Sequence, residues 1–201
     1  MSTTAKVDPV DVGSSPQELA EGLSSSSRRM RQVAAAAFAQ LSRTEPDATL
    51  PFIDIIVESL KRPEARTRWE SLDALVCLVP LDSKSCFGAL EYAEEALFDE
   101  SNGTVRLAAM RFLCKLGSVS KKYAAEVWPL IDEALRCYHG DPEYIDMLVA
   151  VNDFAAGNLP DDVREGLVVR MEFDANNPKS GLVHRSKSII AAAKGEVVAD
   201  A

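Results

Sequence analysis

Few side chains in this sequence are spaced so that they could carry out acid–base or nucleophilic chemistry. The two histidines, His139 and His184, lie 45 positions apart, and each is more typical of a surface or turn residue than of a ligand or base. The adjacent Glu94 and Glu95 point to different sides of a helix, so they do not form an acid–base pair. The sequence has no phosphate-binding loop, nucleophile elbow or H-E-x-x-H motif. We therefore expect no catalytic residues and a protein that is not an enzyme.

The four cysteines do not follow a metal-binding or redox pattern. Cys77, Cys86, Cys114 and Cys137 include no C-x-x-C pair, which argues against a zinc site and a thioredoxin-type centre. Cys77 and Cys114 are more typical of small buried hydrophobic residues than of ligands. Residues 1–14 are small and polar, without the apolar segment of a secretory signal. Reduced thiols in such a chain predict a cytoplasmic protein with no metal and no cofactor.

The charge balance bears on the kind of partner. Among 201 residues there are 22 Lys and Arg against 31 Asp and Glu, a formal net charge of −9. Nucleic-acid binders usually have the opposite balance, because Lys and Arg neutralise phosphates, so nucleic acid is disfavoured as a partner, although a local basic patch could override the total. No apolar run approaches the length of about 18 residues that a membrane span needs.

Three segments share one pattern, which sets the organisation of the chain. Arg31, Arg68 and Arg106 are 37 and 38 positions apart. A small residue follows each arginine three positions later, and a leucine follows ten positions later. These positions hold Ala34, Ser71 and Ala109, and then Leu41, Leu78 and Leu116. A fixed period of this length is typical of an array of helical repeats, in which stacked neighbours bury a continuous core.

Apolar residues at three-and-four spacing predict about five antiparallel helix pairs and no strand. The first helix opens with a capping box, Ser15 and Glu18. We expect Gly117 to end the helix that starts after Asn102. The other helices are expected at about 28–42, 48–61, 64–79, 86–98, 121–138, 141–156, 161–172 and 181–194. The chain is thus predicted to be one repeat domain over 15–195, with a disordered tail over 1–14 and a frayed end over 196–201.

This combination of arginine, small residues and leucine resembles HEAT-type repeats, which are related to armadillo repeats. Prolines within some first helices, at Pro51 and Pro129, add to the resemblance, which extends over about 16–194. It implies an all-α fold, a right-handed α–α superhelix in the form of a short solenoid. It also implies a role as a binding scaffold, with the second helix of each pair lining a concave face.

The resemblance further implies that each repeat arginine meets an acidic residue in the turn before its helix, often the turn of a neighbouring repeat. Asp99 and Glu100 are available to Arg106, and Glu64 or, across the stack, Asp99 to Arg68. The predicted structural ladder consists of Arg31, Arg68, Arg106 and Glu100.

The expected function is that of a non-catalytic protein–protein interaction scaffold or adaptor that binds a partner segment on the concave face. Trp69 is either an interface anchor on this face or a side chain folded onto a neighbouring helix. Three second helices are rich in Lys and Arg while first helices are acidic, so the partner protein or peptide is expected to be acidic. The partner-binding residues predicted from repeat position are Arg29, Gln32, Arg66, Trp69, Asp73, Leu107, Arg111 and Asp146.

The alternative is a protein that acts on nucleic acid, resembling the HEAT-like DNA glycosylases. In that case Trp69, Asp73 and Arg66 would take the roles of the Trp, Asp and Arg that those enzymes place in a basic groove. Glu143, Asp146 and other carboxylates work against a basic groove here. A resemblance to the phycobilin-lyase-like branch of these repeats is weaker, because no residue marks a chromophore site.

Overall fold

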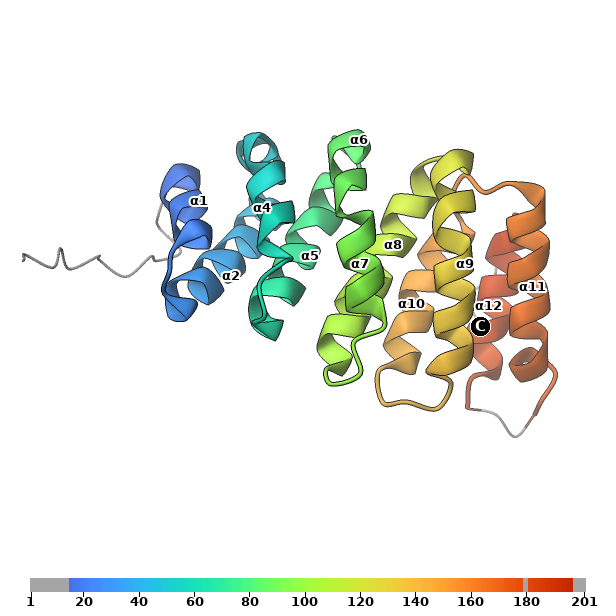
Figure 1. Cartoon of the computed structure of the whole chain (residues 1–201). Coiled ribbons are helices and arrows are strands. Elements are labelled where there is room, and N and C mark those ends of the chain that lie inside the picture. The colour runs from blue at the N-terminus through green and yellow to red at the C-terminus, as the bar shows by residue number, and fades with distance from the viewer. Residues whose placement is uncertain (1–14, 179–180, 197–201) are drawn as a thin grey trace, which may run out of the picture.

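A computed structural model describes residues 15–178 and 181–196, and all of the described residues lie in helices, turns or loops. The predicted tail at 1–14 and residues 197–201 of the predicted frayed end lie outside the described residues. The helices follow one another as pairs set side by side in a row (Figure 1). The all-α helical solenoid predicted from the sequence is confirmed. The elements are α1 (Pro16–Ser24), α2 (Arg28–Thr44), α3 (Pro46–Thr49), η1 (Leu50–Phe52), α4 (Ile53–Ser59), α5 (Ala65–Leu78), α6 (Ser83–Cys86), η2 (Phe87–Ala89), α7 (Leu90–Leu97), α8 (Gly103–Val119), α9 (Lys121–Cys137), α10 (Tyr144–Ala155), α11 (Asp161–Ala175) and α12 (Val183–Lys194).

The pairs form two layers. In Figure 1 the first helices α1, α4, α7, α9 and α11 lie in front, and α2, α5, α8, α10 and α12 lie behind them. Each of these second helices contacts the next one in the row, from α2 through to α12. We call the side of the second helices that faces away from the first helices the second-helix face. It is the surface on which the sequence placed the partner-binding residues.

The core runs between the two layers and is built from the repeated small residues and leucines. Ala34, Ser71 and Ala109 are buried, as are Leu78 and Leu116, because a small side chain lets a neighbouring helix approach closely. Leu41, in the most N-terminal repeat, is half-buried and packs against the same core. Among the described residues, no helix has the length and apolar character needed to cross a membrane.

Two first helices are divided into shorter pieces. The helix expected at 48–61 consists of α3, η1 and α4, with Pro51 inside the 3₁₀ turn, where its missing N–H group breaks the α-helical ladder. The helix expected at 86–98 is likewise divided into α6, η2 and α7. By contrast, α9 continues through Pro129.

Gly117 does not end its helix as predicted, because α8 continues to Val119. A Cβ atom at position 117 would lie 2.5 Å from Cγ2 of Val127 and 2.6 Å from Cε2 of Phe154. Such distances are shorter than van der Waals contact, so the glycine is needed for close approach of α9 and α10 rather than for a left-handed turn. In a sequence, glycine can indicate either the end of a helix or a tightly packed contact, and Gly117 serves the tightly packed contact.

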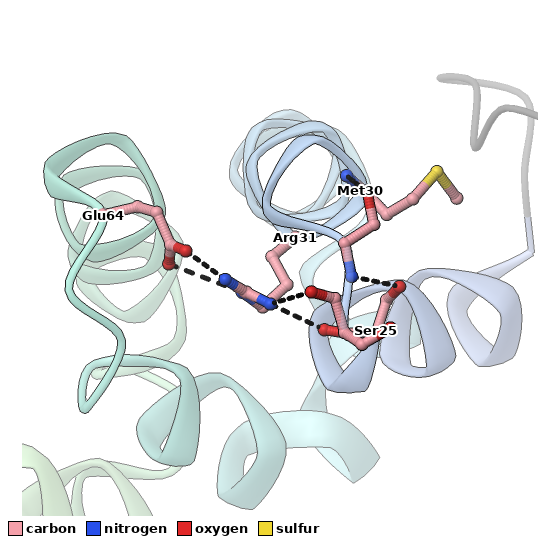
Figure 2. Close-up of polar contacts among 6 residues, drawn as sticks. Ser25, Met30, Arg31 and Glu64 are labelled. Carbon is pink, nitrogen blue, oxygen red and sulfur yellow. Dashed lines mark hydrogen bonds and ion pairs between the residues drawn. The ribbon is translucent and has the colours of Figure 1, made fainter.

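The repeat arginines tie each second helix to the following repeat. Arg31 donates to the backbone oxygens of Ser25 and Ser26, at 2.8 Å and 3.0 Å. On its other side it pairs with Glu64 (Figure 2). Glu64 precedes the first residue of α5 and makes no hydrogen bond to cap its own helix. Its carboxylate therefore lies between the positive end of the α5 dipole and the guanidinium of Arg31.

The pairing with an acidic residue of the next repeat recurs at the two later arginines. Arg68 pairs with Asp99, in the turn before α8. Arg106 donates to the backbone oxygen of Asp99 at 2.9 Å and pairs with Glu143, the N-cap residue of α10. The acidic partner thus comes from the next repeat in each case. Glu100, which the predicted ladder included, is exposed, and Glu143 takes the place expected for it.

We expect Glu64→Gln to lower the free energy of unfolding by about 2–3 kcal/mol, because it leaves the nearly buried Arg31 without its counter-charge. Burial would raise the pKa of Glu64, but the hydrogen bonds and charge of Arg31 outweigh burial and hold the pKa below its usual 4.5. The stabilisation is therefore present above pH 4.5 and is lost as the pH falls through the lowered pKa.

Urea unfolding of the intact protein and of the Glu64→Gln variant, at pH 7 and at pH 3, measures the difference in their free energies of unfolding. Glu58→Gln is the matched control, since Glu58 pairs with Lys61 in an exposed i, i+3 contact and its loss should change stability little. Equal effects of the two substitutions at pH 7 would contradict the prediction.

Candidate functional site

The predicted partner-binding residues all lie on second helices, but they are not equally accessible. Arg29, Arg66, Arg111 and Asp146 are exposed, and Gln32, Trp69, Asp73 and Leu107 are half-buried. They spread over α2, α5, α8 and α10 rather than forming one compact site. Arg111 and Asp146 line the same cavity.

That cavity, which we call the central cavity, has a volume of about 270 Å³ and lies where α5, α8 and α10 meet. Of the predicted residues it includes Arg111 from α8 and Asp146 from α10. Asp73 lies close by, since the charge of Arg111 affects its ionisation. The lining consists of Val76, Arg111, Cys114, Lys115, Asp146, Val149, Ala150 and Asp153.

The central cavity is apolar at its base and charged at its two sides. Cys114 and Ala150 are buried, and Val149 is 42% exposed although it is a large aliphatic side chain. Arg111 and Lys115 are one turn apart on α8, so they share a face of that helix. Asp146 and Asp153 project from α10 on the other side. A basic wall and an acidic wall therefore flank an apolar floor.

A second cavity continues the surface between α10 and α12. It has a volume of about 150 Å³ and shares Val149 and Asp153 with the central cavity. His184 and Arg185 contribute from α12, and Ser188 donates to the side-chain oxygen of Asn152 at 2.9 Å. The two cavities are thus neighbours across α10.

Two charged side chains extend the surface toward α2. Asp73 on α5 pairs with Arg43 on α2 at 3.3 Å. Burial raises the pKa of Asp73, and the positive charges of Arg111 and Arg43 oppose this only in part. The half-buried Cys77 thiol also has a raised pKa because of burial, so it is not an activated nucleophile.

Trp69 and Arg66 lie nearer the start of α5, away from the central cavity. Trp69 is half-buried and packs against the hydrophobic core. Arg66 forms an i, i+4 pair with Glu70 at 3.5 Å. The three residues considered for a nucleic-acid role are therefore held by different contacts: Trp69 by the core, Arg66 by Glu70, and Asp73 by Arg43.

The two histidines are in different places. His139, after α9, contacts Asp174 of α11 through Nε2 at 2.9 Å, whereas His184 lines the second cavity. All four cysteines are free thiols. Within the described residues, no group of three or more His, Cys, Asp or Glu side chains is placed to hold a metal ion.

The layered pairs, the buried small residues and the arginine ties define a HEAT/armadillo-like α-helical repeat fold. Solved structures share this fold. An engineered protein aligns with a TM-score of 0.71 and 15% identity over 90% of this chain and 79% of its own. A designed armadillo repeat protein in complex with the peptide (KR)4 gives 0.70 and 14% identity over 87% and 80%. A computationally designed armadillo repeat protein for modular peptide recognition gives 0.66 and 14% over the same shares, 87% and 80%.

At these identities the likeness shows the fold alone. A scan against protein-family models gave no match, and a search of curated proteins also gave none.

Several residues of the two cavities were not among the predicted site residues. They include Val76, Cys114, Lys115, Val149, Asp153, His184 and Arg185. For the α5 and α8 members a sequence signal existed: Val76, Cys114 and Lys115 lie eight or nine positions after a repeat arginine, one turn beyond the last position considered. The α12 members had no such signal, because the repeat arginine is absent from the last two pairs.

We expect Asp73→Asn to stabilise the protein at pH 7. A raised carboxyl pKa means that the folded state disfavours the ionised form, so the native charge costs stability above that pKa. As the pH falls and Asp73 is protonated, the difference between the two proteins should vanish. Urea unfolding at pH 7 and pH 3 measures this, with the exposed Asp54→Asn as control. A destabilised variant at pH 7 would show that the pair with Arg43 outweighs burial.

Proposed function

We propose that this protein is a non-catalytic interaction scaffold whose second-helix face, the concave side of the solenoid, binds a segment of a partner protein. The observation that carries the proposal is the central cavity, where three consecutive second helices meet and an apolar floor lies between charged walls on α8 and α10. Binding sites typically combine apolar surface with a few polar groups that fix orientation. An exposed valine at such a place is available for contact with a partner.

The size of the cavities favours side chains of a peptide over a free small molecule. Their volumes are about 270 and 150 Å³, below the roughly 300–1,000 Å³ of typical small-molecule sites. Two adjacent small cavities suit successive side chains of one chain crossing α8, α10 and α12. The designed armadillo repeat protein with a bound peptide supports this use of the fold.

A partner peptide agrees better with the charges than nucleic acid does. Phosphate binding favours a continuous basic surface. Here Arg111 and Lys115 face Asp146 and Asp153 across one cavity, so the wall on α10 would repel a phosphate backbone. We also propose a cytoplasmic location, because buried free thiols such as Cys86 and Cys114 are typical of reducing compartments.

Site-specific photo-crosslinking tests the proposed face. A benzophenone amino acid in place of Thr104, exposed on α8, should give discrete crosslinks to a protein partner in lysate of the source organism. The same label in place of Ala125, exposed on the first helix α9, should not. Adding Arg111→Glu with Lys115→Glu should abolish the crosslinks from position 104, because the basic wall is inverted.

The reversal Lys121→Glu with Lys122→Glu, on exposed residues of α9, changes net charge equally and serves as control. Crosslinks from position 125 alone would place binding on the other layer and contradict the proposal. Salt-dependent retention of the protein on heparin that is lost with Arg111→Glu and Lys115→Glu would support the nucleic-acid alternative instead.

A further inference from the structure

Four charged side chains face one another across the central cavity without forming pairs. Arg111 and Lys115 stand on α8, and Asp146 and Asp153 stand on α10. In the described part of the chain none of the four takes part in an ion pair. Opposite charges on neighbouring helices usually gain by pairing directly, so a cavity kept open between them is suited to a third group that contacts both.

The apolar floor of the cavity determines which kind of residue fits in the middle of the bound segment. Val76, Cys114, Val149 and Ala150 present aliphatic and thiol groups, and burial of the Cys114 thiol raises its pKa so that it is neutral at physiological pH. An apolar side chain that covers Val149 would remove an exposed aliphatic surface from water. A charged group at this position would lose hydration without gaining a partner.

From this arrangement we infer that the bound segment carries an apolar residue between an acidic residue, which contacts Arg111 and Lys115, and a basic residue, which contacts Asp146 and Asp153. The inference rests on the proposed function and specifies the partner of that same surface. The sequence predicted an acidic partner peptide; under this inference only the part of the peptide that lies against α8 is acidic.

The spacing of the two charges follows from the geometry of an extended peptide. Successive side chains point to opposite faces of such a peptide. An acidic, an apolar and a basic side chain that all face the cavity therefore occupy alternate positions, with the acid and the base about four positions apart.

Selection from a random twelve-residue peptide library displayed on phage tests the inference without a known partner. The intact protein should enrich peptides with an acid and a base on either side of an apolar residue. Arg111→Glu with Lys115→Glu makes both walls acidic and should enrich peptides with bases on both sides. Asp146→Lys with Asp153→Lys makes both walls basic and should enrich peptides with acids on both sides. The result does not depend on the direction in which the peptide runs.

Matched controls separate local from overall charge. Lys121→Glu with Lys122→Glu, and Glu126→Lys with Glu133→Lys, change net charge equally at exposed residues of α9, and both should select the same peptides as the intact protein. A synthetic peptide selected by the intact protein should bind each cavity variant at least about tenfold more weakly in fluorescence polarisation. Circular dichroism confirms that every variant keeps its helical content.

The outcomes distinguish the inference from the proposed function. The inference would be overturned if the selected peptides lacked the acid–apolar–base pattern and their binding were weakened by Arg185→Glu in the second cavity but by neither central-cavity reversal. That result would leave the proposed binding on the second-helix face intact. Peptides that bind all these variants and the intact protein equally, or no enrichment over bare beads, would overturn both.

Discussion

The structure depends on a guanidinium group shared between consecutive repeats. Arg31 and Arg106 each reach back to backbone oxygens in the turn before their own helix and forward to a glutamate that begins the next second helix. Arginine suits this task because its donors point in several fixed directions from a rigid plane. The glutamates gain as well, since their carboxylates lie at helix N-termini where the dipole favours negative charge. One side chain thereby fixes both the turn and the position of the neighbouring helix.

The same ties join the helices that carry the candidate site. Small residues in the core allow helices to approach closely, and large buried side chains such as Phe38 and Phe112 fill the space between them. The arginine ties act at the N-terminal ends of α5 and α10 and so fix how these helices lie beside α2 and α8. Arg106 and the cavity residues Arg111 and Lys115 belong to the same helix. The pairing of Arg106 with Glu143 therefore joins the two helices, α8 and α10, that carry the charged walls of the central cavity.

Much of this architecture could be read from the sequence because the repeat fixes the phase of each helix. Once Arg106 was placed, Arg111 five positions later had to face away from the core. Local signals were less decisive where one residue type serves two purposes, as at Gly117, which permits close packing instead of ending a helix. They were also less decisive where several acidic residues could pair with one arginine: Glu143 supplies the carboxylate expected from Glu100. The cavities could not be predicted, because they depend on which side chains of three different helices leave space between them. Asp153 and Val149 have no feature in sequence that sets them apart from other residues of α10.

The distance between the two ends of the row tests most directly whether the arginine ties hold the repeats in place. Spin labels attached through unnatural amino acids at the exposed positions Glu21 and Lys187 would report this distance by electron double resonance without disturbing the buried cysteines. The combined variant Glu64→Gln, Asp99→Asn and Glu143→Gln should keep its helical content, yet its distance distribution should be clearly broader than that of the intact protein. A distribution of unchanged width in a variant of unchanged helicity would contradict the account, because the repeats would then be held by core packing alone.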